Sequence, residues 1–237
     1  MDIPSSLAVI ALAALIHASF QLSVSVLTLL SGHSIGAKHS HARLFRLTTS
    51  FVFGAGIMTA LLLSSISLTL QNLFIFRTPQ IIWAASCGLS IGVAISIWFF
   101  YYRHEKGTSL WIPKSMSNYL NNRTKSTKLS AEAFGLGLSS ILGEILFVIA
   151  PLLMAALVLV QLPYIWQLVG IVVYTLVSLL SLLIVWVLVG SGHNLSKIQK
   201  WRESNKYFLQ FASGLGLLVL VFFVYVTEIL GYLVGYN

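Results

Sequence analysis

One carboxylate and one proline stand inside a long apolar stretch of the chain. Glu144 and Pro151 both lie within GLSSILGEILFVIAPLL, residues 137–153. A charged carboxylate at the centre of a bilayer costs about 2.5–3.5 kcal/mol on insertion scales. A chain that keeps such a residue holds it protonated, pairs it, or turns it toward water. Glu144 is therefore the first candidate for chemistry.

The residues around Glu144 favour a site that takes up a cation or a proton. On a continuous helix, Gly137, Ser140, Glu144 and Pro151 would share one stripe of small and polar residues. Pro151 has no amide hydrogen and would leave the carbonyl of Phe147 free on a kinked helix. The alternative is structural: a protonated Glu144 locks two helices together through a hydrogen bond, and Pro151 only bends the span.

A second polar stripe in the first apolar segment is a possible counterpart of Glu144. It holds His17, Gln21, Ser25 and Thr28, at spacings of four, four and three residues. Histidine titrates near neutral pH, so a pair between His17 and Glu144 would make a proton relay. The alternative is that these side chains hold one helix to another by hydrogen bonds.

Other polar residues are weaker candidates. Glu228 lies in the outer part of the last apolar segment, where it could reach the membrane surface or take part in transport, and Tyr174 and Gln167 rank below it. A histidine cluster follows the first segment and could collect zinc, nickel or cobalt. No Asp, Glu or Cys accompanies it, so a solvated basic loop is the competing interpretation. The cluster consists of His33, His39 and His41.

The elements that position these residues are membrane helices. Of the 237 residues, 57% are hydrophobic and 8% are charged, against about 25% charged in soluble domains. A helix that crosses a ~30 Å hydrocarbon layer needs about 20 apolar residues, and only helices or closed barrels satisfy the backbone in lipid. The sequence predicts an all-α integral membrane protein with six spans, at 7–30, 47–71, 80–102, 131–160, 164–190 and 207–235.

The positions of the basic residues predict the topology. The 14 Lys and Arg residues fall between the spans, and successive loops carry 3, 1, 6, 0 and 4 of them. The positive-inside rule then places both termini outside and the three basic loops in the cytoplasm. The net charge of +8 is explained by these loops and by attraction to anionic lipid. We expect no nucleic-acid partner.

The longest loop divides the chain into two halves of three spans. Residues 1–102 form the first half, residues 103–130 a basic cytoplasmic loop with a short interfacial helix, and residues 131–237 the second half. Three spans in each half give opposite orientations, as in a 3+3 inverted repeat. Laying 15–30 over 138–153 places Gln21 on Glu144, although only three leucines are identical.

The sequence carries no catalytic or cofactor motif. It has no His-Glu-x-x-His, no Gly-x-Ser-x-Gly, no phosphate-binding loop and a single cysteine, Cys87. Cys87 fits a small packing residue. The glycines in GLG at 135–137 and SGLG at 213–216 fit helix packing. We therefore expect neither an enzyme nor a cofactor.

The plan resembles the lysine exporter superfamily of small transporters. The shared features are three plus three spans, a long basic inner loop, and the segments AFGLGLSSILGE and FASGLGLLVLV. The resemblance implies export of amino acids or metal ions, or electron transfer between thiols. The paired membrane cysteines of the thiol branch are missing here. The nickel and cobalt branch is similar at His17-Ala18 but differs at Ser19, Phe20 and Gln21, and of the two prolines usual in the amino-acid branch only Pro151 is present.

These patterns favour a small multi-pass transporter of a prokaryotic inner membrane. It would export a small solute or ion, coupled to protons, by alternating access. The expected site lies between spans 1 and 4 and comprises His17, Gln21, Ser25, Thr28, Ser140, Glu144 and Pro151. The alternative is a non-transporting membrane subunit or assembly factor. Under either interpretation the expected partners are the lipid bilayer, a small solute or ion as substrate of the transporter, and a second copy or an unknown membrane protein as further options.

Overall fold

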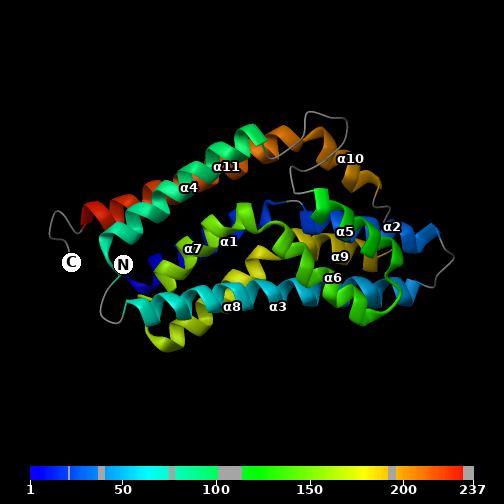
Figure 1. The fold of residues 1–237 in the computed structure, drawn as a ribbon, viewed down its shortest axis with the longest axis horizontal. Coiled ribbons are helices and arrows are strands. Elements are labelled where there is room, and N and C mark those ends of the chain that lie inside the picture. The colour runs from blue at the N-terminus through cyan, green and yellow to red at the C-terminus, as the bar shows by residue number, and fades with distance from the viewer. Residues whose placement is uncertain (21, 37–40, 75–77, 101–113, 192–195, 232–237) are drawn as a thin grey trace.

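The computed structural model describes residues 1–20, 22–36, 41–74, 78–100, 114–191 and 196–231. Within these ranges every regular element is a helix and there is no strand. The molecule is elongated, and the N-terminus lies at the same end as the helical turn that ends at Leu230 (Figure 1). The predicted all-helical class is confirmed for this part of the chain.

Three continuous helical segments are long and apolar enough to cross a membrane. Helix α3 (His41–Leu73) and helix α4 (Gln80–Phe100) are two of them. The third is α11 (Lys206–Val224), which continues into a π-helical turn (Tyr225–Leu230). Their lengths meet the requirement of a ~30 Å hydrocarbon layer. Apolar helices of this kind indicate a membrane protein.

Three further segments of membrane length are bent helix pairs. The pairs bend by 49°, 80° and 54°, in chain order. Counting each pair as one span raises the number of candidate spans from three to six by length and composition. The pairs are α1 (Ile3–Ala18) with α2 (Leu22–Gly36), α6 (Ser130–Gly143) with α7 (Ile145–Leu159), and α8 (Tyr164–Ser178) with α9 (Leu180–Gly190).

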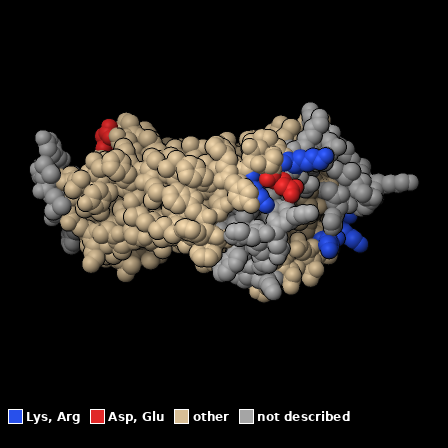
Figure 2. Space-filling view, turned by 90° about the horizontal axis from the view of Figure 1, so that it is seen from above, with Lys and Arg blue, Asp and Glu red and all other residues tan. Residues whose placement is uncertain are grey.

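Two short helices lie at the basic end of the molecule. Helix α5 (Lys114–Ser126) contacts α2 and α6 and buries Leu120, and α10 (Ser196–Ser204) precedes α11. The helix predicted in the loop 103–130 is thus present from Lys114 onward. Lys and Arg gather at this end on the face shown in Figure 2, while most of that face is uncharged.

Close helix packing depends on two glycines. A Cβ added at Gly137 on α6 would collide with the backbone carbonyl of Phe51 on α3, and one at Gly54 would collide with that of Phe134. Small residues let membrane helices approach this closely. The predicted packing role is confirmed for Gly137, whereas a Cβ on Gly135 would meet nothing within 4 Å.

The large bend in the fourth segment is at Glu144 and not at Pro151. Helix α7 continues through Pro151, whereas α6 and α7 meet at an 80° angle across Glu144. The expected continuous stripe from Gly137 to Pro151 is therefore wrong, because the helix axis changes direction within it. The same applies to the stripe predicted from His17 to Thr28, since α1 ends at Ala18.

Candidate functional site

The three helix breaks meet at one small polar cavity. The end of α1, the α6–α7 junction and the α8–α9 junction all line it. The space has room for about one water molecule. Its polar lining residues are His17, Ser23, Thr59, Glu144, Ser178 and Ser181. The breaks are thus related in space although they are far apart in the sequence.

Glu144 connects two of the breaks. It is the single residue between α6 and α7, and only 3% of its surface is exposed. Its carboxylate accepts hydrogen bonds from the backbone N–H of Ser23 at 3.0 Å and from the Ser23 hydroxyl at 3.4 Å. Ser23 is the second residue of α2, so the carboxylate caps the positive end of that helix. Charge-assisted bonds of this type hold a carboxylate more strongly than neutral ones.

His17 lies at the end of α1 and pairs with Tyr174 of α8. Its Nδ1 is 3.1 Å from the tyrosine hydroxyl, and both side chains are buried. The two rings also contact each other at a centroid distance of 5.8 Å. The structure therefore does not show the direct His17–Glu144 pair of the expected relay. Both residues line the cavity, but the hydrogen-bond partner of His17 is Tyr174.

Serine hydroxyls satisfy the backbone where α1 stops. Ser19 donates to the carbonyl of Ile16 at 2.5 Å, and Ser181 of α9 donates to the carbonyl of Ala18 at 2.6 Å. A helix end leaves carbonyls without intrahelical partners, which is costly away from water. The break in the first segment is thus supported by a side chain from the fifth.

Arg202 reaches the same helix as the Glu144 carboxylate from the basic end. Its guanidinium donates to the Ser25 hydroxyl of α2 at 2.9 Å, and the residue is only 5% exposed. A buried basic residue in α10 is unexpected from the sequence, where Arg202 reads as one of the loop charges. Helix α2 therefore carries an acidic contact at Ser23 and a basic one at Ser25.

Several predicted site residues do not line the cavity, and their polar groups bond to other parts of the chain. Thr28 donates to the carbonyl of Ser25 at 2.8 Å, and Ser140 donates to that of Gly137 at 2.8 Å, each within its own helix. Pro151 is buried within α7 and does not line the cavity. Gln21 lies outside the described residues. Of the predicted set, His17 and Glu144 line the cavity, and Ser25 contacts Arg202.

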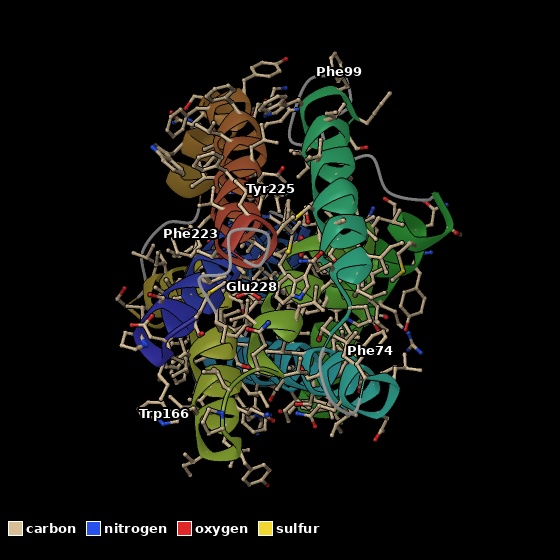
Figure 3. The ribbon with its side chains drawn as sticks, turned by 90° about the vertical axis from the view of Figure 1, so that its left-hand side faces the viewer. Phe74, Phe99, Trp166, Phe223, Tyr225 and Glu228 are labelled. Carbon is tan, nitrogen blue, oxygen red and sulfur yellow. The ribbon has the colours of Figure 1, made fainter. Side chains whose placement is uncertain are left out.

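Glu228 lies at the opposite end of the molecule from the basic helices. Its carboxylate is 3.8 Å from the N-terminal amine and accepts a hydrogen bond from Gln161 at 2.9 Å. Figure 3 looks onto this end, with Glu228 near the centre of the view and Phe74 and Trp166 farther out. The structure does not bring Glu228 together with Glu144.

The weak metal candidates are not tested. The side chains of His33, His39 and His41 lie outside those that the structure describes. Within the described part of the chain, no group of three His, Cys, Asp or Glu side chains is close enough to hold a metal ion. Cys87 is buried, consistent with its predicted packing role.

Sequence reasoning missed Ser23, Ser181 and Arg202 and ranked Tyr174 too low. Serine is common in membrane helices, so type and position give no signal for the first two. The sequence did give a signal for Tyr174, because a tyrosine hydroxyl buried in a membrane segment needs a hydrogen-bond partner. Arg202 contacts Ser25 across 177 positions of sequence, and its spacing gives no hint of that contact.

The cavity combines groups that can hold and exchange a proton. A carboxylate at a helix N-terminus can alternate between the charged form, which accepts both Ser23 bonds, and the protonated form, which gives up part of this interaction. The imidazole of His17 and the hydroxyl of Tyr174 can pass a hydrogen bond in either direction. The arrangement contains no activated nucleophile in the described residues.

Comparison with known proteins adds no relative: no family model, no curated protein and no solved structure matches this chain.

Proposed function

We propose that the chain is a small six-span membrane transporter that exports a small solute or ion, coupled to protons, through a site at the helix breaks. The single observation that carries this is the buried Glu144 carboxylate at the N-terminus of α2, next to a polar cavity. Broken helices whose ends face a common site are how many secondary transporters bind ions and substrates.

The inverted 3+3 repeat is part of this proposal, and the positions of the breaks support it. The overlay of 15–30 on 138–153 sets Leu22, where α2 begins, on Ile145, where α7 begins. Two half-helices thus start at equivalent positions in the two halves. An α-helical break costs backbone hydrogen bonds, so its recurrence at the same register favours a shared architecture over chance.

In an inverted repeat the α1–α2 segment corresponds to α6–α7, α3 corresponds to α8–α9, and α4 corresponds to α11. The contacts between the segments agree with this correspondence. Helix α3 contacts α6 and α7, and correspondingly α8 and α9 contact α1. Helix α4 contacts α7, and correspondingly α11 contacts α1. Helices α4 and α11 contact each other, and exchanging the two halves leaves this contact unchanged. One difference breaks the correspondence: the α8–α9 segment is bent by 54°, whereas α3 is continuous.

The proposed coupling acts through α2. Ionised Glu144 holds the first turn of α2 by the Ser23 N–H and hydroxyl. Protonation removes the negative charge that the helix N-terminus attracts and converts one oxygen into a donor, so this hold weakens. The first turn of α2 then loses one of its two holds, and the bond from Arg202 to Ser25 remains as the point about which the helix moves. Alternating access would follow from this switch.

The test is ligand-dependent thermal stability of the purified protein in detergent. The panel consists of amino acids and divalent metal ions, at mildly acidic and mildly alkaline pH. A ligand at 100 times its dissociation constant stabilises the folded state by about 2.7 kcal/mol. We expect one class to raise the melting temperature, with a different size of shift at the two pH values.

Glu144→Gln separates the site from the fold. A glutamine keeps an acceptor for Ser23, so the variant should fold but lose the ligand shift and its pH dependence. The matched control is Glu203→Gln, which removes an exposed carboxylate on α10 and should keep both. A ligand shift that survives in Glu144→Gln would remove Glu144 from the site.

The second candidate is a non-transporting membrane subunit or assembly factor. It is favoured by the small size of the cavity and by the two Ser23 bonds to the Glu144 carboxylate, which fit a structural lock. In this case no ligand shifts the melting temperature, and Glu144→Gln lowers stability without any ligand.

A further inference from the structure

An apolar hollow lies outside the polar cavity, between α3 and two other helices of the molecule. It is a groove of about 420 Å³ between α3 and the α8–α9 pair. Its floor and walls include Phe53, Gly56, Leu179, Leu183 and Trp186.

The groove presents no hydrogen-bonding group to an occupant. Its two hydroxyls belong to Thr49 and Thr175, and each donates to a carbonyl of its own helix, at 2.7 and 2.8 Å. The Thr49 hydroxyl also accepts the indole N–H of Trp186 at 2.9 Å. Apolar chains gain by burial at such a surface, whereas a polar solute would lose its hydration without compensation.

The length of the groove matches half a bilayer. Its α3 wall runs from Thr49 to Ala60, which at 1.5 Å per residue is about 16 Å. One leaflet contributes about half of a ~30 Å hydrocarbon layer. An acyl chain of one leaflet has this length, whereas a transmembrane helix crosses both leaflets, so the groove fits a single acyl chain better than a helix.

A positive charge lies about one helical turn before the groove on α3. Arg46 is exposed and lies three residues before Thr49, on the stripe that continues through Phe53, Gly56 and Ala60. Beside it, Phe45 stacks on Trp186 with ring centroids 5.3 Å apart. Indole rings favour the level of lipid headgroups, and basic residues attract anionic ones.

We propose that this groove binds an anionic phospholipid of the leaflet at the basic end, with an acyl chain along α3 and the headgroup at Arg46. The bound chain would press on Leu179, which lines both the groove and the polar cavity. A lipid at this position would therefore support the α8–α9 bend from outside. This inference does not depend on transport.

The experiment compares two phospholipids with identical acyl chains, phosphatidylglycerol and phosphatidylcholine, on the delipidated protein in a mild detergent. Native mass spectrometry counts bound lipid, and the melting temperature reports stabilisation. We expect phosphatidylglycerol to bind about fivefold more tightly, the effect of one basic residue at an anionic surface. Arg46→Gln should abolish this preference and leave phosphatidylcholine binding unchanged.

Matched variants test the position of the lipid. Ala60→Phe fills the apolar end of the groove and should weaken binding of both lipids, whereas Ala85→Phe on the exposed face of α4 should not. Lys125→Gln removes an exposed charge of α5 at the same end and should keep the preference.

Equal binding of the two lipids, or a preference that survives Arg46→Gln, would overturn the proposal in favour of ordinary surrounding lipid. If filling the groove instead dissociates a dimer, the occupant is a second copy. Should Ala60→Phe fail to fold, the surface variant Arg46→Gln still decides.

Discussion

The broken helix pairs around Glu144 and the unbroken pair α4–α11 satisfy their backbone hydrogen bonds in different ways. Both regions are apolar and both must satisfy their backbone inside a membrane. In α4–α11 the ladders run without interruption, and Gln210 of α11 donates to the carbonyls of Ile97 and Trp98 near the end of α4. Around Glu144, two of the three breaks have partners from other segments: Ser23 for Glu144 and Ser181 for Ala18.

This difference separates two kinds of stability. In α4–α11, the contacts are between faces of neighbouring helices, such as the Trp98–Phe211 stack with centroids 5.9 Å apart. At the breaks, single polar atoms hold helix ends in place. A substitution there leaves a buried backbone group without a partner, which costs about 1–3 kcal/mol. We expect the region of the breaks to be more sensitive to small changes.

The largest effect should come from the glycine that holds the broken segment against α3. Gly137→Ala places a Cβ against the backbone carbonyl of Phe51, which cannot move without shifting α3. We expect a loss of more than about 4 kcal/mol and little folded protein in the membrane, measured by detergent-resistant yield.

Gly214→Ala is the matched change in the unbroken pair. The new Cβ would meet the side chain of Trp98, which can shift, so the loss should be about 1–3 kcal/mol. Gly135→Ala has open space and should be tolerated. Equal losses for Gly137→Ala and Gly214→Ala would contradict the proposed contrast.

The next effect concerns the carboxylate cap of α2. Glu144→Leu leaves both donors of Ser23 without this acceptor, and we expect unfolding to become easier by about 3 kcal/mol, since each orphaned buried donor costs about 1–3 kcal/mol. Thermal unfolding in detergent measures it. Gln210→Leu, the corresponding change in α4–α11, should cost less, because the Trp98 carbonyl that it leaves behind is only partly buried. A larger loss for Gln210→Leu would reverse the comparison.

A smaller effect is expected at the His17–Tyr174 pair. Tyr174→Phe keeps the buried ring and removes the hydroxyl 3.1 Å from His17. The loss should be about 1–2 kcal/mol, read as a lower melting temperature. Tyr164→Phe changes a residue that is 76% exposed and serves as the control. An unchanged melting temperature for Tyr174→Phe would show that the hydrogen bond contributes nothing to stability.

The smallest effect should distinguish hydroxyls that bond across a break from those that bond within a helix. Ser181→Ala removes the donor to Ala18 and should cost about 1 kcal/mol. Ser139→Ala removes a hydroxyl that bonds to Gly135 of its own helix, where the ladder remains, and should change stability by less than about 0.5 kcal/mol. The two melting temperatures would be compared directly, and indistinguishable shifts would count against support of the break by Ser181.

The sequence by itself determined the helical class and the approximate bounds of the apolar helices, and it placed the Glu144 carboxylate inside one of them. The predicted segment 131–160 corresponds to Ser130–Leu159, and 164–190 corresponds to Tyr164–Gly190. These bounds follow from local physics, because the thickness of a bilayer sets the length of an apolar run and charges mark where it ends. A carboxylate in such a run is conspicuous without any structure.

Only the tertiary structure decided where the segments break and which groups complete the breaks at Ala18 and Glu144. The apolar run around Leu179 contains no residue pattern that predicts a bend. In the fourth segment the sequence predicts a kink at Pro151, whereas the bend is at Glu144. A helix can stop inside a membrane only where partners for its free ends are supplied. Those partners are Ser23 for Glu144 and Ser181 for Ala18. They lie more than 120 residues away in sequence, so local pattern could not reveal them.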